Sequence, residues 1–283
     1  KKKKNKDDIP VVEFRKECRD FAKNWMDIQS EEFQRLGVYG DWEAPYSTMR
    51  YDSEARIMSE IGKFLMNGGL YRGVKPVMWS PVEKTALAEA EIEYHDHIST
   101  TIFARFPIIK SPNNILTGHE IIIWTTTPWT MPGNRAVAYG KDIDYSLLEI
   151  SSVEESSLAK LGDKILIASD LLEDVINELS IIDYKVSNKL KGSELKDSIL
   201  AHPLHKFGYD HDVLLLEADF VTTDQGTGFV HIAPGHGSDD FELGKKNNLP
   251  IPETVSDNGV LDYNLPLLGG LRVLKDNEKI ADI

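Results

Sequence analysis

The hydrophobic residues change their spacing near residue 100, and no other feature constrains the fold as strongly. Before that point the pattern is helical, because apolar side chains recur every three or four residues: Phe14, Cys18, Phe21, Trp25 and Ile28. This face predicts a helix from Val11 to Leu36 that Gly37 ends, and we expect it to pack on a second helix, on the β-rich region or on a neighbouring chain. The second helix is predicted from Ser53, its N-cap, to the Gly68–Gly69 pair.

Beyond residue 100, β-branched runs bounded by turn residues predict strands in five segments: 119–127, 135–139, 163–169, 213–223 and 228–233. A helix with Ser169 as its cap is predicted at 169–180. The predicted fold class is therefore α/β, in which residues 100–283 form a β-rich, barrel-like domain with a largely antiparallel sheet and peripheral helices. Residues 1–75 are predicted to be a helical segment of another domain, and residues 76–99 a connection.

Composition narrows the class of protein. A chain of 283 residues with 41% hydrophobic content can bury a sizeable core. Its net charge of −14, despite a Lys-rich start, disfavours a protein that grips a long nucleic-acid duplex, so any such contact is expected to be small and local. No apolar run is long enough for a membrane helix, and the single cysteine, Cys18, cannot form an internal disulfide. These features predict a cytoplasmic protein.

The stretch WTTTPWTMPGNRA, residues 124–136, is one candidate site. Successive strand residues point to opposite faces, so Thr125 and Thr127 are predicted to share one side and Thr126 the other. Pro128 ends the strand ladder and leaves hydroxyls beside aromatic surface, which is typical of a small polar pocket. The threonines alone are also explained by ordinary strand propensity.

The stretch GTGFVHIAPGHGSDDFELG, residues 226–244, gathers His231, His236, Asp239 and Asp240. The histidines are five residues apart across a Pro-Gly turn, a spacing that matches no common zinc signature. The glycine-rich turn leads into a strand, whereas a phosphate loop leads into a helix. Two interpretations stay open: a core histidine beside a helix cap, for which Asp239 is the candidate, or a pocket that handles an amine and a water.

Both stretches resemble the signature segments of the editing domain of isoleucyl-tRNA synthetases, which is an insertion in their class I catalytic domain. Four earlier segments resemble the part of the catalytic domain that leads into this insertion, in the same order: FRKECRDFAKNW, FQRLGVYGDWEAPYSTM, GGLYRGVKPVMWSP and TALAEAEIEYHDH. The resemblance covers nearly the whole chain. It implies that residues 1–75 are a partial segment of the Rossmann-type catalytic domain and that residues 100–283 are the editing domain.

The resemblance implies a substrate, a tRNA(Ile) 3′ end that carries valine as an ester with a free ammonium group. Asp240 is then expected to pair with the ammonium, and His231 to orient the ribose or water and assist proton transfer, with an unperturbed pKa near 6.5. An activated ester needs no protein nucleophile. The two stretches are expected to share one pocket. The remaining residues are expected to bind substrate: Trp124, Thr125, Thr126, Thr127, Gly237 and Asp239.

Two motifs of the family, a HIGH-type and a KMSKS-type string, do not occur in this sequence. The resemblance therefore implies a fragment without the aminoacylation site, in which ATP and Mg²⁺ serve only the full-length synthetase. Many relatives carry a Cys-x-x-Cys zinc knuckle where Ser80 and Glu83 stand, so no metal is expected in this chain. Two alternatives to an editing hydrolase remain: a binding module for the aminoacylated tRNA end, and a stand-alone deacylase.

Overall fold

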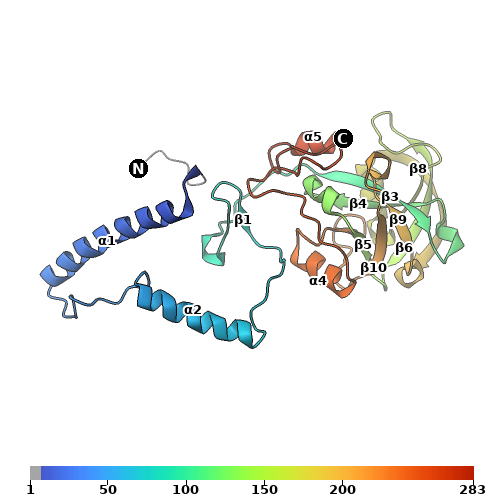
Figure 1. Cartoon of the computed structure of the whole chain (residues 1–283). Coiled ribbons are helices and arrows are strands. Elements are labelled where there is room, and N and C mark those ends of the chain that lie inside the picture. The colour runs from blue at the N-terminus through green and yellow to red at the C-terminus, as the bar shows by residue number, and fades with distance from the viewer. Residues whose placement is uncertain (1–7) are drawn as a thin grey trace. The chain divides into compact units, whose positions relative to one another are not determined.

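The computed structural model describes residues 8–283, and the chain divides into two compact units at Gly73 and Val74. The Lys-rich start lies outside the described residues. Each unit is described by itself, and Figure 1 shows the elements of both. Among residues 8–283, no helix is long and apolar enough to cross a membrane.

The first unit contains α1 (Val11–Arg35) and α2 (Tyr51–Met66). Gly37 and Gly68 follow them with φ near +79°, a conformation that glycine adopts without strain, so both predicted helix ends are confirmed. The prediction that Ser53 caps the second helix was wrong. Arg50 occupies the N-cap position, and the helix begins earlier because Asp52 places a carboxylate in its first turn.

Arg19 of α1 contacts α2: it pairs with Glu54, and its guanidinium carbon lies 4.7 Å from the centroid of the Tyr51 ring. The apolar face of α1 stays exposed, with Phe21 at 68% and Trp25 at 47% of full exposure. Of the three predicted partners of this face, the second helix does not cover it. Its packing on the β-rich region or on a neighbouring chain stays a prediction.

The second unit is built on a nine-stranded sheet in the order β11-β5-β10-β9-β3-β4-β7-β6-β8. The five predicted strand regions are confirmed as β4 (Glu120–Thr125), β5 (Ala136–Tyr139), β7 (Lys164–Ala168), β10 (Asp212–Glu217) and β11 (Phe229–Ile232). The sheet adds four strands to these: β3 (Ile102–Lys110), β6 (Asp144–Val153), β8 (Ile181–Lys191) and β9 (Ile199–Ala201). A separate two-stranded ribbon pairs β1 (Trp79–Ser80) with β2 (Thr85–Ala86).

The α/β class with a largely antiparallel sheet is confirmed, since only β10–β5 and β4–β7 are parallel pairs in the nine-stranded sheet. The sheet is not a closed barrel, because β11 and β8 are its two edges. It curls, so that β11 packs against β4 without pairing with it. The last residues of β4 and β11 are thereby brought together.

Three short helices lie at the periphery: α3 (Leu172–Glu178), α4 (Ser238–Lys246) and α5 (Asn277–Ala281). Ser169 was predicted to cap this helix, and that prediction was wrong. It begins a 3-10 turn that precedes α3. Helix α4 buries Leu243 against Ala136 and Ala138 of β5, whose small side chains leave room for the helix. This packing fixes α4 over the strand that neighbours β11.

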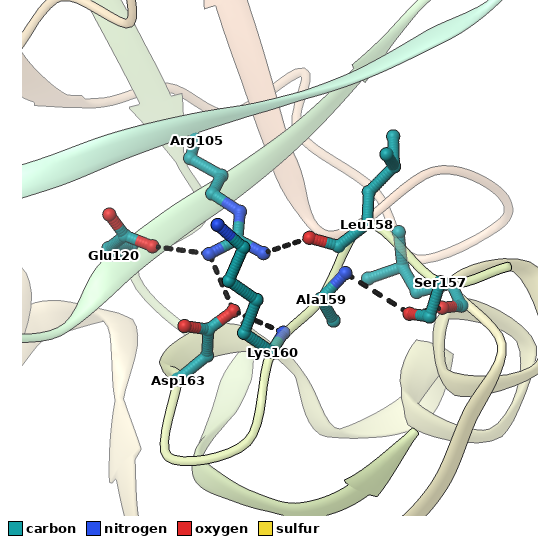
Figure 2. Close-up of polar contacts among 8 residues, drawn as sticks. Arg105, Glu120, Ser157, Leu158, Ala159, Lys160 and Asp163 are labelled. Atoms are coloured by element: carbon teal, nitrogen blue, oxygen red, sulfur yellow. Dashed lines mark hydrogen bonds and ion pairs between the residues drawn. The ribbon is translucent and has the colours of Figure 1, made fainter. Parts of the chain in front are cut away.

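A polar cluster around Arg105 on β3 ties the loop before β7 to the sheet (Figure 2). Its guanidinium nitrogen Nη1 lies 3.1 Å from Glu120 of β4 and 2.7 Å from Asp163, and Nη2 donates to the carbonyl of Leu158 at 3.0 Å. Asp163 also accepts from the backbone of Lys160 at 2.8 Å. These three contacts join the loop before β7 to strands β3 and β4.

Candidate functional site

The first wall of the candidate site is the end of β4 and the 3-10 segment η4 (Pro128–Gly133) that follows it. Thr125 is buried, Thr127 is half-buried, and Thr126 is exposed, which confirms the predicted alternation of the three side chains. The hydroxyl oxygens of Thr125 and Thr127 lie 3.2 Å apart, and Thr125 Oγ1 accepts from the backbone N–H of Thr127 at 3.1 Å. These bonds hold the strand end just before Pro128.

The second wall is the turn that joins β11 to α4. Gly237 occupies the N-cap position of α4, so the prediction that Asp239 caps the helix was wrong. Asp239 is instead the second residue of the helix and is exposed to solvent. Asp240, one residue further, points back across the turn, and its Oδ1 accepts from the backbone N–H of Ala233 at 2.7 Å.

Gly237 contributes to the site because it has no side chain. A Cβ atom at this position would lie 2.3 Å from Oδ2 of Asp240, far inside van der Waals contact. Any side chain here would therefore displace the carboxylate. The glycine allows Asp240 to sit against the turn.

The two walls enclose one cavity of about 160 Å³. Its lining combines both sequence stretches: Trp124, Thr125, Thr127, Thr130, Val230, His231, Ala233, His236 and Asp240. The predicted convergence of the two stretches on one pocket is thereby confirmed. Three predicted substrate-binding residues, Thr126, Gly237 and Asp239, do not line it. Larger cavities of about 640 and 900 Å³ lie elsewhere in the unit, but neither contains both stretches.

His231 is buried, and both of its ring nitrogens have partners. Its Nδ1 lies 2.7 Å from Nδ2 of Asn134, an amide nitrogen that also donates to the carbonyl of Ala136. Since Asn134 donates, Nδ1 must accept, and the ring proton belongs to Nε2. Nε2 lies 2.9 Å from Thr130 Oγ1, whose own proton is donated to the carbonyl of Thr127.

This chain of bonds fixes one tautomer of a neutral imidazole. Burial lowers the pKa of His231 from the ordinary value of 6.5 to about 3. Two residues of this hydrogen-bonded chain, Thr130 and Asn134, were not predicted as site residues. Both lie within the WTTTPWTMPGNRA stretch, which is the part of the sequence from which they could have been found.

Opposing effects act on the pKa of the Asp240 carboxyl group. Burial raises its pKa above the ordinary value, and the charge of Asp239 acts in the same direction. The hydrogen bond from the Ala233 N–H opposes this shift. The first turn of a helix also favours a negative charge.

The second histidine of the cavity, His236, is partly buried, and burial lowers its pKa. Its Nε2 lies 3.0 Å from Oγ1 of Thr254. The ring meets Trp129 edge to face at 5.2 Å between centroids, with an interplanar angle of 88°. His236 is a cavity residue that sequence reasoning considered only for metal binding.

The glycines that open the second stretch serve packing. Gly228 has a φ of +79°, and an added Cβ would lie 2.3 Å from Cβ of Ala168. The chain continues directly into β11, so the prediction that this turn leads into a strand is confirmed. Within the described residues, no group of three or more His, Cys, Asp or Glu side chains is arranged to hold a metal ion.

A family model for class I tRNA synthetases (I, L, M and V) matches residues 1–237. The chain therefore belongs to the class I tRNA synthetase family. It is similar over nearly its whole length to isoleucine–tRNA ligases, as the sequence resemblance predicted. It is 50% identical to that of Gluconobacter oxydans (strain 621H) over 282 residues, which are 99% of this chain and 29% of that protein. It is also 50% identical to the isoleucine–tRNA ligase of Pelagibacter ubique (strain HTCC1062), over 100% of this chain and 31% of that protein.

The chain thus spans about three tenths of the length of these relatives. Among solved structures it is similar to the crystal structure of GlLeuRS-CP1, with a TM-score of 0.49 and 13% identity over 65% of this chain and 94% of the other. It is also similar to the editing domain of the P. knowlesi cytosolic leucyl-tRNA synthetase. That TM-score is 0.42, with 13% identity over 52% of this chain and 63% of the other.

Proposed function

We propose that this chain carries out post-transfer editing, the hydrolysis of the aminoacyl ester in valyl-tRNA(Ile). The observation that carries the proposal is the single cavity that is lined by Thr125, Thr127 and Thr130 together with Asp240. Membership of the class I tRNA synthetase family supports a substrate of this kind. The proposed partners are the 3′ end of tRNA(Ile) carrying valine and the remainder of the synthetase, and the proposed compartment is the cytoplasm.

Asp240 is the proposed partner of the substrate's ammonium group. Its Oδ1 is engaged by Ala233, while Oδ2 accepts no hydrogen bond from another residue among those described. A carboxylate with one oxygen fixed and the other available is suited to a charge-assisted contact. The carboxylate distinguishes an aminoacyl ester from an ordinary ester by its charge.

The proposed reaction uses water as the nucleophile. Water attacks the ester carbonyl carbon, the bond from that carbon to the ribose oxygen breaks, and the ribose oxygen leaves with a proton. The threonine hydroxyls are suited to hold the water and the ester by hydrogen bonds. His231 positions Thr130 in this proposal, because both of its nitrogens are already bonded and its neutral form prevails at physiological pH. The reaction requires neither ATP nor Mg²⁺.

The small volume of the cavity supports discrimination by size. A cavity of about 160 Å³ matches the scale of one benzene-sized group, so its room for a larger amino-acid side chain is limited. A synthetic site distinguishes one methylene by only ~1–3 kcal/mol, a limit for which isoleucyl-tRNA synthetases are the standard example. A second pocket that admits valine and clashes with isoleucine removes the wrong product selectively.

The test is to incubate the chain with valyl-tRNA(Ile) and isoleucyl-tRNA(Ile) and to follow the loss of each ester. We expect faster loss of the valyl ester, unchanged by a chelator and without ATP. Equal rates for both esters would contradict the size argument. Saturable binding of valyl-tRNA(Ile) without ester loss would favour the binding-module alternative.

A further inference from the structure

The two histidines of the cavity differ in which ring nitrogens are free. His231 has Asn134 on Nδ1 and Thr130 on Nε2. His236 has Thr254 on Nε2, while its Nδ1 makes no hydrogen bond in the part of the chain that the structure describes. This Nδ1 is also not sealed from solvent. A ligand in the cavity therefore finds an available ring nitrogen only on His236.

The ring of His236 is held in place from several sides. Its Cδ2–Nε2 edge faces Gly133, where an added Cβ would lie 3.1 Å from Cδ2. Thr254, which is only 2% exposed, fixes Nε2 on the same edge. Trp129 contacts the ring edge to face, and the backbone N–H of His236 donates to the carbonyl of Ala233 at 2.9 Å. Nδ1 lies on the opposite edge of this fixed ring.

On the basis of the proposed editing function, we infer that His236 is a further catalytic residue, whose Nδ1 accepts a hydrogen bond from the attacking water. In this proposal the ring carries its proton on Nε2 and donates it to Thr254, so that the lone pair is on Nδ1. As the water oxygen bonds to the ester carbon, its proton passes to Nδ1. The same proton then moves to the departing ribose oxygen, so the ring ends in its initial neutral state.

The surroundings of the ring suit this role. Burial lowers the pKa of His236, so the ring is neutral and able to accept a proton at pH 7. The titratable neighbours across the cavity are His231 on β11, which is neutral, and the carboxylate of Asp240 on α4. The two side chains that contact the ring, Trp129 and Thr254, do not titrate at these pH values, and Glu253 is the charged residue next to Thr254 in the chain.

The test compares two substitutions that each keep one end of the imidazole. His236→Gln keeps an amide near Nε2 and the contact with Thr254, but it removes Nδ1. His236→Asn keeps a polar group near Nδ1 and loses the contact with Thr254. We expect His236→Gln to lower kcat for valyl-tRNA(Ile) hydrolysis by about 100-fold or more with little change in KM. His236→Asn should lower kcat as well, because its amide can accept a hydrogen bond from the water but cannot take the proton.

The pH profile provides a readout that a purely structural role would not change. The wild-type rate should fall as the pH drops through the lowered pKa of His236 and Nδ1 becomes protonated. His236→Gln should lose this part of the fall and keep the part that protonation of Asp240 causes. Wild-type kcat and an unchanged profile in His236→Gln would overturn the inference. If both variants fail to fold, a wild-type rate that is flat from pH 7 to pH 4 would overturn it. A wild-type chain that hydrolyses neither ester would instead refute the proposed function.

Discussion

Replacing Asp240 by Asn separates the charge of this side chain from its structural hydrogen bond. The carboxylate accepts from the Ala233 N–H through Oδ1, and the amide of Asn offers an oxygen at the same place. The substitution therefore keeps the shape of the turn between β11 and α4. It removes only the negative charge that is proposed to pair with the ammonium of the substrate.

The expected loss of activity follows from the value of that pair. A hydrogen bond to a charged group contributes ~1.5–3 kcal/mol, which corresponds to a decrease in kcat/KM of about 10- to 150-fold. The effect on folding is smaller, because loss of a favourable charge at a helix N-terminus costs ~0.3–1 kcal/mol and removal of a partly buried charge offsets part of this. Asp240→Ala should cost a further ~1–3 kcal/mol, since it leaves the buried N–H of Ala233 unpaired.

The assay measures kcat/KM for valyl-tRNA(Ile) hydrolysis and the free energy of unfolding in urea on the same preparations. Asp239→Asn is the matched control, because Asp239 lies in the same helical turn but outside the cavity. We expect the control to keep nearly full activity. Wild-type kcat/KM in Asp240→Asn, or an equal loss in Asp239→Asn, would refute the proposed role of the Asp240 charge.

Three further predictions concern the walls of the cavity and one buried histidine, His202. Thr127→Ala should enlarge the cavity and allow hydrolysis of isoleucyl-tRNA(Ile), while the exposed Thr126→Ala should not; a uniform loss on both esters would contradict the steric wall. Gly237→Ala should displace the Asp240 carboxylate and lower activity about tenfold or more at a stability cost of ~1–3 kcal/mol, measured by ester hydrolysis and urea unfolding. Burial lowers the pKa of His202 to about 4, so the stabilisation that its neutral form provides is complete above pH 6.5. It should be lost at up to ~1.4 kcal/mol per pH unit as the pH falls towards 4, and urea titrations of His202→Gln should show a smaller slope.

The sequence predicted those parts of the fold that local patterns determine. Five strand regions and the ends of α1 and α2 followed from β-branched runs and glycines, whereas strands β3 and β8 did not. Strand β3 contains Pro107 and Arg105, and β8 has a mostly polar, exposed composition that conceals the alternation of a strand. Sheet neighbours and long-range contacts such as those of Arg105 stabilise these segments, and a local pattern does not report them.

The candidate site was predicted as two segments, but its internal connections were not. The alternation of the threonines followed from strand geometry, and the convergence of the segments followed from the resemblance. The bond from Asn134 to His231 joins residues 97 positions apart, and no spacing rule predicts it. The role of Asp239 as a cap failed because Asp and Gly are both good N-caps, and only tertiary packing selected Gly237.

The chain of hydrogen bonds from Asn134 through His231 and Thr130 to Thr127 has a consequence for transplanting this activity. It begins at the carbonyl of Ala136, which is both the last residue of the first stretch and the first residue of strand β5. A graft that ended this stretch before Asn134 would leave His231 free to adopt either tautomer and to rotate. A portable version of this site must therefore carry the first stretch through Ala136, together with strand β11, which pairs with β5.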